Sequence, residues 1–167
     1  MLIISNILGL LASLVMVYSG SINDKKRFIF VEIIMYVLFI CSQFTAGAYT
    51  ATIVNFLSLI RNLIYYKDKL NMKNKLVLIG LMIIFSLLIN NNGIWGIIPL
   101  IGGSLFTYCI DMKDMIKFKW VLVICSFLWF IFDIHYEIYT SSFFDIGTVI
   151  TSLWSIRFLV KNKGEKC

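Results

Sequence analysis

Seven apolar runs, separated by short polar loops, constrain the fold of this chain more than any other feature of its sequence. A helix that crosses a hydrocarbon core of about 30 Å needs about 20 residues, with about 17 as a practical minimum. Six runs reach this minimum, whereas the fourth has about 15 residues and would span only roughly 22 Å. The pattern predicts an all-α fold, a polytopic bundle of seven transmembrane helices. The runs are Leu2–Ser19, Phe28–Phe44, Ala48–Tyr66, Leu76–Asn90, Ile94–Ile110, Trp120–Tyr136 and Phe144–Val160.

The composition of the chain agrees with a lipid environment. Apolar residues make up 60% of the sequence and charged residues only 14%, with a mean hydropathy of +0.89. Soluble domains are nearer half apolar and a quarter charged, so too few polar side chains remain here to cover a surface in water. The net charge of +6 does not indicate nucleic acid, because the basic residues form short clusters between the apolar runs. No basic residue precedes the first run, so we expect a spanning helix there and not a cleaved signal.

The positions of the basic residues predict the orientation in the membrane. Lys and Arg fill the first, third and fifth loops and the C-terminal tail, whereas the second, fourth and sixth loops contain none. Cytoplasmic loops carry the excess of basic residues in membrane proteins. We therefore expect the N-terminus outside and the C-terminus in the cytoplasm, with Arg61 and Arg157 at the cytoplasmic ends of the third and seventh helices. The sixth loop, with Glu137 and Asp145, is then outside.

One pattern occurs twice in the chain. Gly47–Lys67 reads GAYTATIVNFLSLIRNLIYYK and Gly147–Lys163 reads GTVITSLWSIRFLVKNK, and Arg61 then aligns with Arg157. Similar matches precede this pair, and they include Gln43 aligned with Asp133. We expect two three-helix units of the same orientation joined by one inverting helix, a 3+1+3 parallel repeat. The whole of residues 1–167 then forms one integral membrane domain, with repeat one at about 1–67, the linker helix at about 75–91 and repeat two at about 93–163.

Polar side chains recur at three- and four-residue steps on several of the expected helices, so that they share one face of each helix. In hydrocarbon such side chains seek hydrogen-bond partners, and these faces should therefore turn toward other helices. Two interpretations remain open, which are hydrogen bonds between helices and the lining of a solute cavity. The polar positions are Thr52, Asn55, Ser58 and Asn62; Thr148, Thr151, Ser152 and Ser155; Glu32, Tyr36 and Gln43; Ser126, Trp129 and Asp133; and Asn6 and Ser13.

Asp133 is the most informative ionisable residue of the sequence. A carboxylate deep in a membrane helix costs about 2.5–3.5 kcal/mol, so such a residue is usually paired, protonated or in contact with water. Asp133 could bind a cation, relay a proton or contact a polar solute, or it could simply reach water at the outer end of its helix. Glu32 stands close enough to Arg27 and the cytoplasmic surface to be solvated or ion-paired. His135, two residues from Asp133, is expected at the interface.

The fifth run contains Pro99, followed by Gly102 and Gly103. Proline removes a backbone donor and kinks a helix, so this segment could be a hinge of a moving helix, although close packing explains the glycines equally well. Trp129 is deep enough to stack on a solute. No catalytic motif is present, and the four cysteines fit no metal or redox spacing, so we expect no enzyme, no cofactor and no metal.

Three segments carry a family resemblance: GAYTATIVNFLSLIRNLIYYK, GIIPLIGGSLF and SLWSIRFLVKNK. Over nearly its whole length the chain resembles the YgjV-like family of small bacterial inner-membrane proteins, which is more distantly similar to the SWEET and PQ-loop (MtN3-like) sugar transporters. The resemblance implies a bacterial inner-membrane location and a SWEET-like fold with alternating access. It also implies that Asn55 and its repeat mate Thr151 flank a central solute. Thr151 departs from the paired asparagines of the sugar transporters, and no glutamine follows Pro99, so sugar specificity does not carry over.

The sequence therefore predicts a permease for a small polar solute, such as a sugar or nucleoside-like metabolite. The alternative is a non-transporting membrane protein of the same fold: a receptor, a partner-binding protein or an immunity-type protein. A polar cavity shared by both halves would favour the permease, and a dry apolar centre would favour the alternative. The expected partners are lipid and the solute, with no nucleic acid, and a homo-oligomer is left open. The expected binding residues are Asn55, Thr151, Gln43, Asp133, Trp129 and Ser58, with Pro99 as part of a gate.

Overall fold

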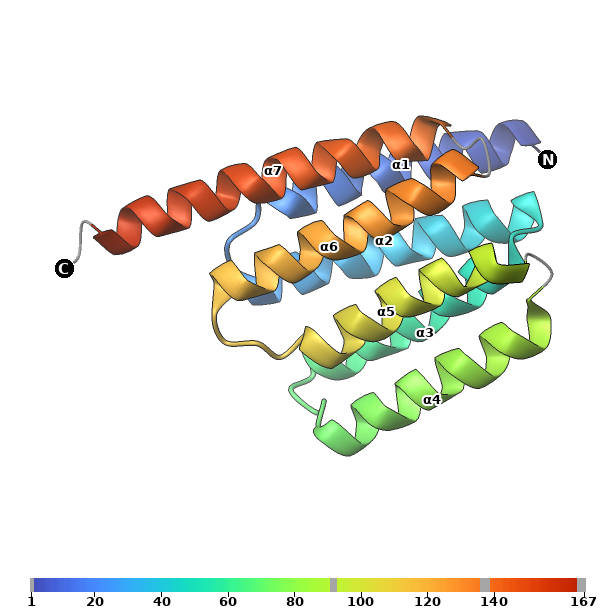
Figure 1. The fold of residues 1–167 in the computed structure, drawn as a ribbon, viewed down its shortest axis with the longest axis horizontal. Coiled ribbons are helices and arrows are strands. Elements are labelled where there is room, and N and C mark those ends of the chain that lie inside the picture. The colour runs from blue at the N-terminus through green and yellow to red at the C-terminus, as the bar shows by residue number, and fades with distance from the viewer. Residues whose placement is uncertain (1, 91–92, 136–138, 165–167) are drawn as a thin grey trace.

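The computed structural model describes residues 2–90, 93–135 and 139–164 of the chain, without the side chains of residues 2–4, 139–140 and 163–164. Helices make up the described part, which contains no strand (Figure 1). The predicted all-α fold with seven long helices is confirmed. The helices are α1 (Leu2–Ser21), α2 (Lys25–Ala46), α3 (Tyr49–Tyr66), α4 (Met72–Ile89), the short 3-10 helix η1 (Gly93–Gly96), α5 (Ile97–Cys109), α6 (Met115–His135) and α7 (Tyr139–Gly164).

Helix α4 is longer than the apolar run that predicted it. The helix has 18 residues because it begins at Met72, where the Asn71 side chain accepts a hydrogen bond from the backbone N–H of Asn74 at 2.8 Å. An asparagine at this position satisfies one of the unpaired N–H groups of a helix start. By length and composition α4, α2, α6 and residues 141–162 of α7 could each cross a membrane, and residues 5–21 and 93–109 form shorter apolar helices.

The helices form a closed ring of six with one helix outside it. In this ring α2 lies between α1 and α3, α6 lies between α5 and α7, and the contacts α1–α7 and α3–α5 close the circle. Helix α4 packs against α3 and α5 at the edge of the bundle (Figure 1). Within the ring, the order of neighbours is unchanged when α1, α2 and α3 are exchanged for α5, α6 and α7, whereas α4, which packs on α3 and α5, does not follow this exchange. A duplicated three-helix unit would produce this pattern, and the internal repeat itself stays a prediction.

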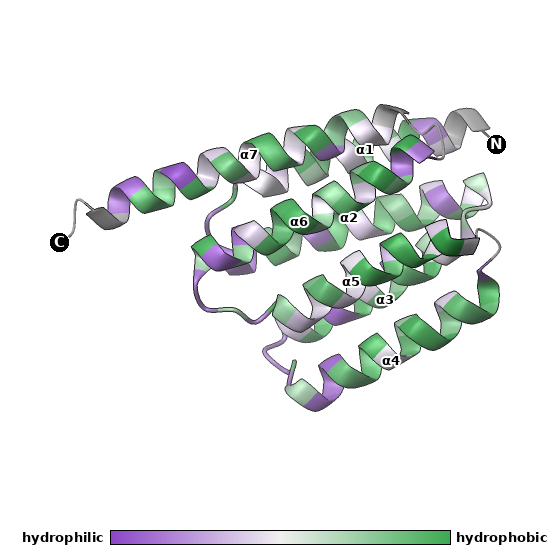
Figure 2. Cartoon of the chain, viewed as in Figure 1, coloured by the Kyte–Doolittle hydropathy of each residue, from purple (hydrophilic) through white to green (hydrophobic). Residues whose placement is uncertain are grey.

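The loops with basic residues meet at one end of the bundle, which we call the basic end (residues 22–27, 67–75 and 110–119). There the Lys25 Nζ donates to the Met112 carbonyl oxygen, and Lys26 forms an ion pair with Asp68 at 2.8 Å. Figure 2 shows hydrophilic colour at these loops and hydrophobic colour along most of the helices. The start of α1, the turn from α2 to α3 at Gly47 and the start of α7 lie at the other end, which we call the open end.

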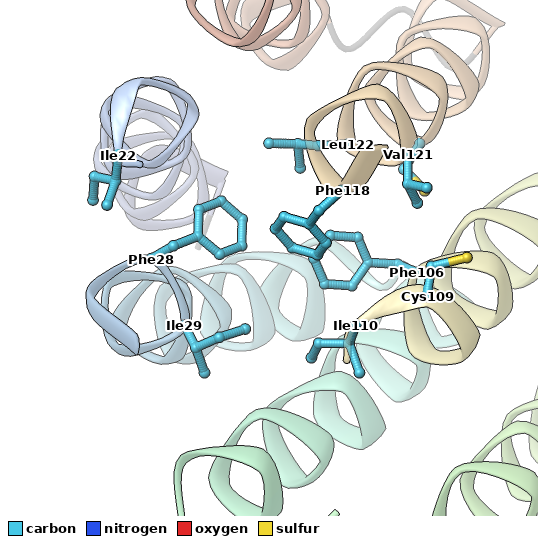
Figure 3. Packing of buried hydrophobic residues seen from close by; sticks show 10 residues of the cluster. Ile22, Phe28, Ile29, Phe106, Cys109, Ile110, Phe118, Val121 and Leu122 are labelled. Carbon is cyan, nitrogen blue, oxygen red and sulfur yellow. The ribbon is translucent and has the colours of Figure 1, made fainter. Parts of the chain in front are cut away.

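Three phenylalanine rings fill the centre of the ring of helices next to the basic end. The rings of Phe28, Phe106 and Phe118 lie with centroids 5.2 to 6.4 Å apart, and all three side chains are buried. They come from α2, α5 and α6, and Figure 3 shows them pointing toward one another. Ile29 and Ile110 pack around them. We call Phe28, Phe106 and Phe118 the aromatic cluster, and it closes the middle of the bundle at this end.

The outer surface of the bundle is apolar, as a surface in lipid should be. Leu88 of α4 is 75% exposed and Trp154 of α7 is 76% exposed. A water-soluble protein rarely presents so many large apolar side chains together. Trp154, which lies in the repeated segment, therefore faces outward and does not reach the interior.

Candidate functional site

A cavity lies at the centre of the ring of six helices. It contains about 700 Å³ of space free of protein atoms, part of which opens to the outside. The part of it that the centre of a water molecule can occupy measures about 70 Å³, which is room for several waters. Every helix of the ring contributes to its wall, and α4 contributes no residue. Its polar lining consists of Glu32, Tyr36, Gln43, Asn55, Ser58, Ser126, Trp129, Asp133, Ser141 and Asp145.

Five of the six residues predicted to bind a solute line this cavity together. Asn55 and Ser58 reach it from α3, Gln43 from α2, and Trp129 and Asp133 from α6. The amide nitrogen of Asn55 donates to the amide oxygen of Gln43 at 2.8 Å. This bond fixes both amides and leaves the remaining amide groups free to meet a polar molecule in the cavity.

Thr151 does not line the cavity, so the structure does not place Asn55 and Thr151 on opposite sides of a shared site. The Thr151 hydroxyl donates to the carbonyl oxygens of Val17 in α1 and of Thr148 in its own helix, each at 3.2 Å. A Cβ atom on Gly20 would come within 2.2 Å of this hydroxyl. Because Gly20 has no side chain, α1 approaches α7 closely, and Thr151 becomes part of their contact.

Pro99 is buried in the first turn of α5, directly after η1. The N–H groups of a first turn have no partner within the helix, so a proline there removes no helical hydrogen bond and causes no kink. Pro99 therefore does not interrupt α5 itself, and its expected part in a gate stays a prediction. Gly102 and Gly103, one turn later, line the cavity instead.

Asp133 and Asp145 form a pair of carboxyl groups in the cavity wall. The two side chains lie close enough to interact, and Ser141 is a neighbour of Asp133. Only 5% of Asp133 and 2% of Asp145 is exposed. The prediction that Asp145 lies in an outer loop is wrong, because α7 already begins at Tyr139. Glu137, assigned to the same loop, lies outside the described residues.

A helical pattern in the sequence could have identified Asp145. Asp145, Thr148, Ser152 and Ser155 follow one another at three- and four-residue steps and so share one face of α7. All four are buried. The polar stripe of this helix therefore extends one turn beyond the positions that the sequence analysis used.

Arg61 stands in the second half of α3 and is buried inside the bundle, a burial that the loop pattern did not predict. Its side chain is 0% exposed. The guanidinium group donates to the Asn62 amide oxygen at 2.9 Å, to the Tyr36 hydroxyl at 3.0 Å and to the Thr107 hydroxyl at 3.1 Å. It also lies over the Phe106 ring, 4.6 Å from the centroid. We call these residues the Arg61 network, and it connects α2, α3 and α5 beside the aromatic cluster.

Glu32 belongs to the same region and is not solvated, which corrects the sequence-based interpretation. It is 3% exposed and accepts a hydrogen bond from the amide nitrogen of Asn62 at 3.3 Å. Asn62 thus joins the Glu32 carboxyl group to the Arg61 guanidinium. Lys119, also buried, donates to the carbonyl oxygens of Ser19 and Gly20 at the end of α1.

The cavity continues into a second hollow that runs toward the open end. Phe39, Gln43, Asp133 and Ser141 line both spaces. Further polar side chains of the second hollow come from the first turns of α1, and they are Ser5, Asn6 and Ser13. Toward the basic end the cavity stops at Phe106, a member of the aromatic cluster. The site therefore has an entrance at one end and a barrier of phenyl rings at the other.

A family model described as a bacterial inner membrane protein, Imp-YgjV, matches residues 3–163. The chain belongs to this YgjV family. The family resemblance noted in the sequence is thereby confirmed, and so is its inner-membrane character. No curated protein and no solved structure matches the chain, so the distant similarity to SWEET and PQ-loop transporters stays a prediction.

Within the described ranges this YgjV family member has no group of three or more His, Cys, Asp or Glu side chains placed to hold a metal ion. Cys125 lines the cavity, and its thiol lies 3.4 Å from the Gly102 carbonyl oxygen in a hydrogen bond. His135 stacks on the Trp95 ring with centroids 3.7 Å apart, away from the cavity lining. The chemical capacity of the site therefore rests on its carboxyl and amide groups and on its aromatic walls.

Proposed function

We propose that this YgjV family member is a permease that carries a small polar solute across the inner membrane by alternating access. The observation that supports this proposal is the polar cavity shared by all six helices of the ring. Buried polar groups in a membrane protein are costly unless they serve a pathway or a structural contact. A partner-binding or immunity-type protein of this fold would need no polar cavity, whereas a receptor would use it to bind a ligand without transport.

The proposal includes two three-helix units that move against each other, with α4 as the linker. The symmetric order of neighbours and the absence of α4 from the cavity wall support this division. Inverted and parallel repeats commonly place a substrate site between their units. In this proposal the protein is not an enzyme and needs no cofactor, since the cavity only has to bind and release the solute.

The proposed orientation has the N-terminus outside and the basic end in the cytoplasm, following the distribution of Lys and Arg. The entrance hollow then faces the outside, and the aromatic cluster closes the cytoplasmic side. This arrangement corresponds to one of the two states that alternating access requires. Separation of Phe28 from Phe106 and Phe118 would produce the other state.

Flux through proteoliposomes tests the permease proposal. The purified full-length protein is reconstituted, and uptake is measured with a mixture of labelled sugars, nucleosides and amines. We expect uptake of at least one of these solutes above the level of empty liposomes, and we expect Asn55→Ala to reduce that uptake at least tenfold. Thr52→Ala is the matched control, because the Thr52 hydroxyl bonds the Ala48 carbonyl of its own helix.

Two results would contradict the proposal. Equal uptake by Asn55→Ala and the unaltered protein would show that the cavity is not the pathway. Binding of a solute without any uptake would instead favour the receptor-type alternative. Cysteine-scanning accessibility at the loops would test the orientation separately, because Lys69→Cys should react only with reagents that reach the cytoplasmic side.

A further inference from the structure

The carboxyl pair of Asp133 and Asp145 has an unused binding capacity. Two buried carboxyl groups side by side disfavour a second negative charge, so the pair holds one proton. The Oδ2 atom of Asp145 is buried and accepts no hydrogen bond from a donor among the residues that the structure describes. Asp145 is 2% exposed and lines the cavity. A buried carboxyl oxygen without a partner costs free energy, and a ligand that pairs with it would remove that cost.

No Lys or Arg side chain stands near this pair among the described residues. The described Lys and Arg residues outside the Arg61 network lie at the basic end or in the last turns of α7, and the sequence has none at 28–60, 76–112 and 120–156. The groups around the pair from neighbouring helices are neutral. They are Asn6 and Ser13 from α1, Gln43 from α2, Asn55 from α3, glycines from α5 and Ser141 from α7. His135, on the same helix as Asp133, stacks on Trp95.

The charge of the whole cavity has one sign. Glu32, Asp133 and Asp145 line it, whereas no Lys, Arg or His does so among the described residues. The Asn62 amide and the nearby Arg61 offset the charge of Glu32, so the uncompensated acidic groups are those of the pair. Trp129 adds an aromatic side chain to the same wall, whereas the Tyr36 ring already has the Arg61 guanidinium over it. Aromatic faces attract cations, most strongly when water is excluded.

We propose that the solute of this permease is a small organic cation, an amine or a quaternary ammonium compound, and that Asp133 and Asp145 bind its positive charge. This inference rests on the proposed function. When the cation docks, the O–H bond of the protonated carboxyl breaks, and the proton leaves through the hollow at the open end. Both carboxylates then face the cation, so one positive charge replaces another, and the charge of the site stays constant.

Thermal unfolding of the full-length protein in detergent tests this inference with pairs of probes that differ only in charge. Choline is compared with its neutral isostere 3,3-dimethylbutan-1-ol, and tyramine with 4-propylphenol. A ligand that binds only the folded state raises the melting temperature. We expect at least one cation to raise it by several degrees and its neutral isostere to leave it unchanged.

The variant Asp145→Asn keeps the shape of the side chain but removes its charge, and we expect it to lose the cation-dependent shift. Asp68→Asn is the matched control, because it removes the same formal charge from an exposed residue at the basic end. We also expect binding of the cation to release about one proton per molecule in weakly buffered solution. If Asp145→Asn does not fold, the melting temperatures of the unaltered protein with each cation and with its neutral isostere still show whether binding depends on the positive charge.

Three results would overturn the inference. These are equal shifts from a cation and its neutral isostere, a full cation shift in Asp145→Asn, and no shift with either cation. Stabilisation and uptake of a neutral sugar alone would overturn the cation site and leave the permease proposal intact. Cation binding without uptake in proteoliposomes would have the opposite meaning, because the site would stand and the permease proposal would fail.

Discussion

The two ends of the cavity both carry buried acidic groups, yet they differ in what surrounds those groups. Near the basic end, Glu32 is joined through Asn62 to Arg61, whose guanidinium has three hydrogen-bond acceptors. Near the open end, Asp133 and Asp145 lie beside each other, and the Oδ2 atom of Asp145 accepts no hydrogen bond within the described residues. The acidic group near the basic end has a basic partner within the protein, and we call this the complete end. The acidic pair near the open end has none among the described residues, and we call this the incomplete end.

This difference indicates that the charged groups at the two ends of the cavity have different roles, one in stability and the other in binding. A buried charge that has its partners within the protein stabilises one arrangement of helices, and removal of one partner is costly. A buried acidic pair without a basic partner is destabilising by itself, and such pairs in membranes commonly belong to ligand or ion pathways. The Arg61 network therefore holds helices together, whereas the carboxyl pair remains available to a ligand.

The largest expected effect is on the complete end. Arg61→Met would leave the Glu32 carboxyl buried without its counter-charge, and the loss of a partner from a buried pair costs about 3–5 kcal/mol. We expect a large fall in the free energy of unfolding, measured by denaturant titration in mixed micelles. Arg157→Met, on the exposed repeat mate, should leave it unchanged. Partial recovery in the double variant Glu32→Gln, Arg61→Met would confirm that the two charges are coupled, and no recovery would contradict it.

The second effect concerns the barrier beside the complete end. Phe118→Ala removes a buried ring from the aromatic cluster, which should cost about 3 kcal/mol of stability. It should also open a path past Phe28 and Phe106. Proteoliposomes loaded with a small solute should then lose it even when the outer solution contains none. Phe127→Ala, an exposed ring on the same helix, serves as the control. An unchanged leak rate would place the barrier elsewhere.

A third, smaller effect concerns the incomplete end. Asp133→Asn should remove the dependence of uptake on a pH gradient, because a shared proton can no longer leave and return. Its cost in stability should be less than about 1 kcal/mol, since an amide of the same shape can still donate to Asp145. The measurement is uptake at several gradients, with Asp68→Asn beside it. Retained pH dependence in Asp133→Asn would show that the proton resides elsewhere.

The smallest effect is expected at the exposed ion pair of Lys26 and Asp68, where the side chains are 62% and 70% exposed. Exposed pairs contribute little because water screens them. Lys26→Met should therefore not change the melting temperature measurably, at low or at high salt. A clear decrease in the melting temperature would show that this exposed ion pair stabilises the fold as much as the buried charges do.

Much of the candidate site could be predicted from local spacing. Polar residues at helical steps predicted that Asn55, Ser58, Gln43, Trp129 and Asp133 lie on inward faces, and the structure brings them to one cavity. Asp145 was missed because it was assigned with Glu137 to the outer loop, although it stands at the start of the seventh apolar run. The buried position of Arg61 was missed because the loop rule treats every arginine near a helix end as exposed.

The order of apolar runs determined by itself that the chain forms a seven-helix membrane protein, because a segment of about 20 apolar residues in lipid must satisfy its backbone as a helix. The polar stripes likewise determined which faces turn inward. Only the tertiary structure decided which polar groups meet. Gly20 lets α1 come close to α7 and so takes Thr151 out of the cavity, while α2 and α5 supply partners of the buried Arg61. Such partners come from other helices, and spacing within one helix carries no information about them.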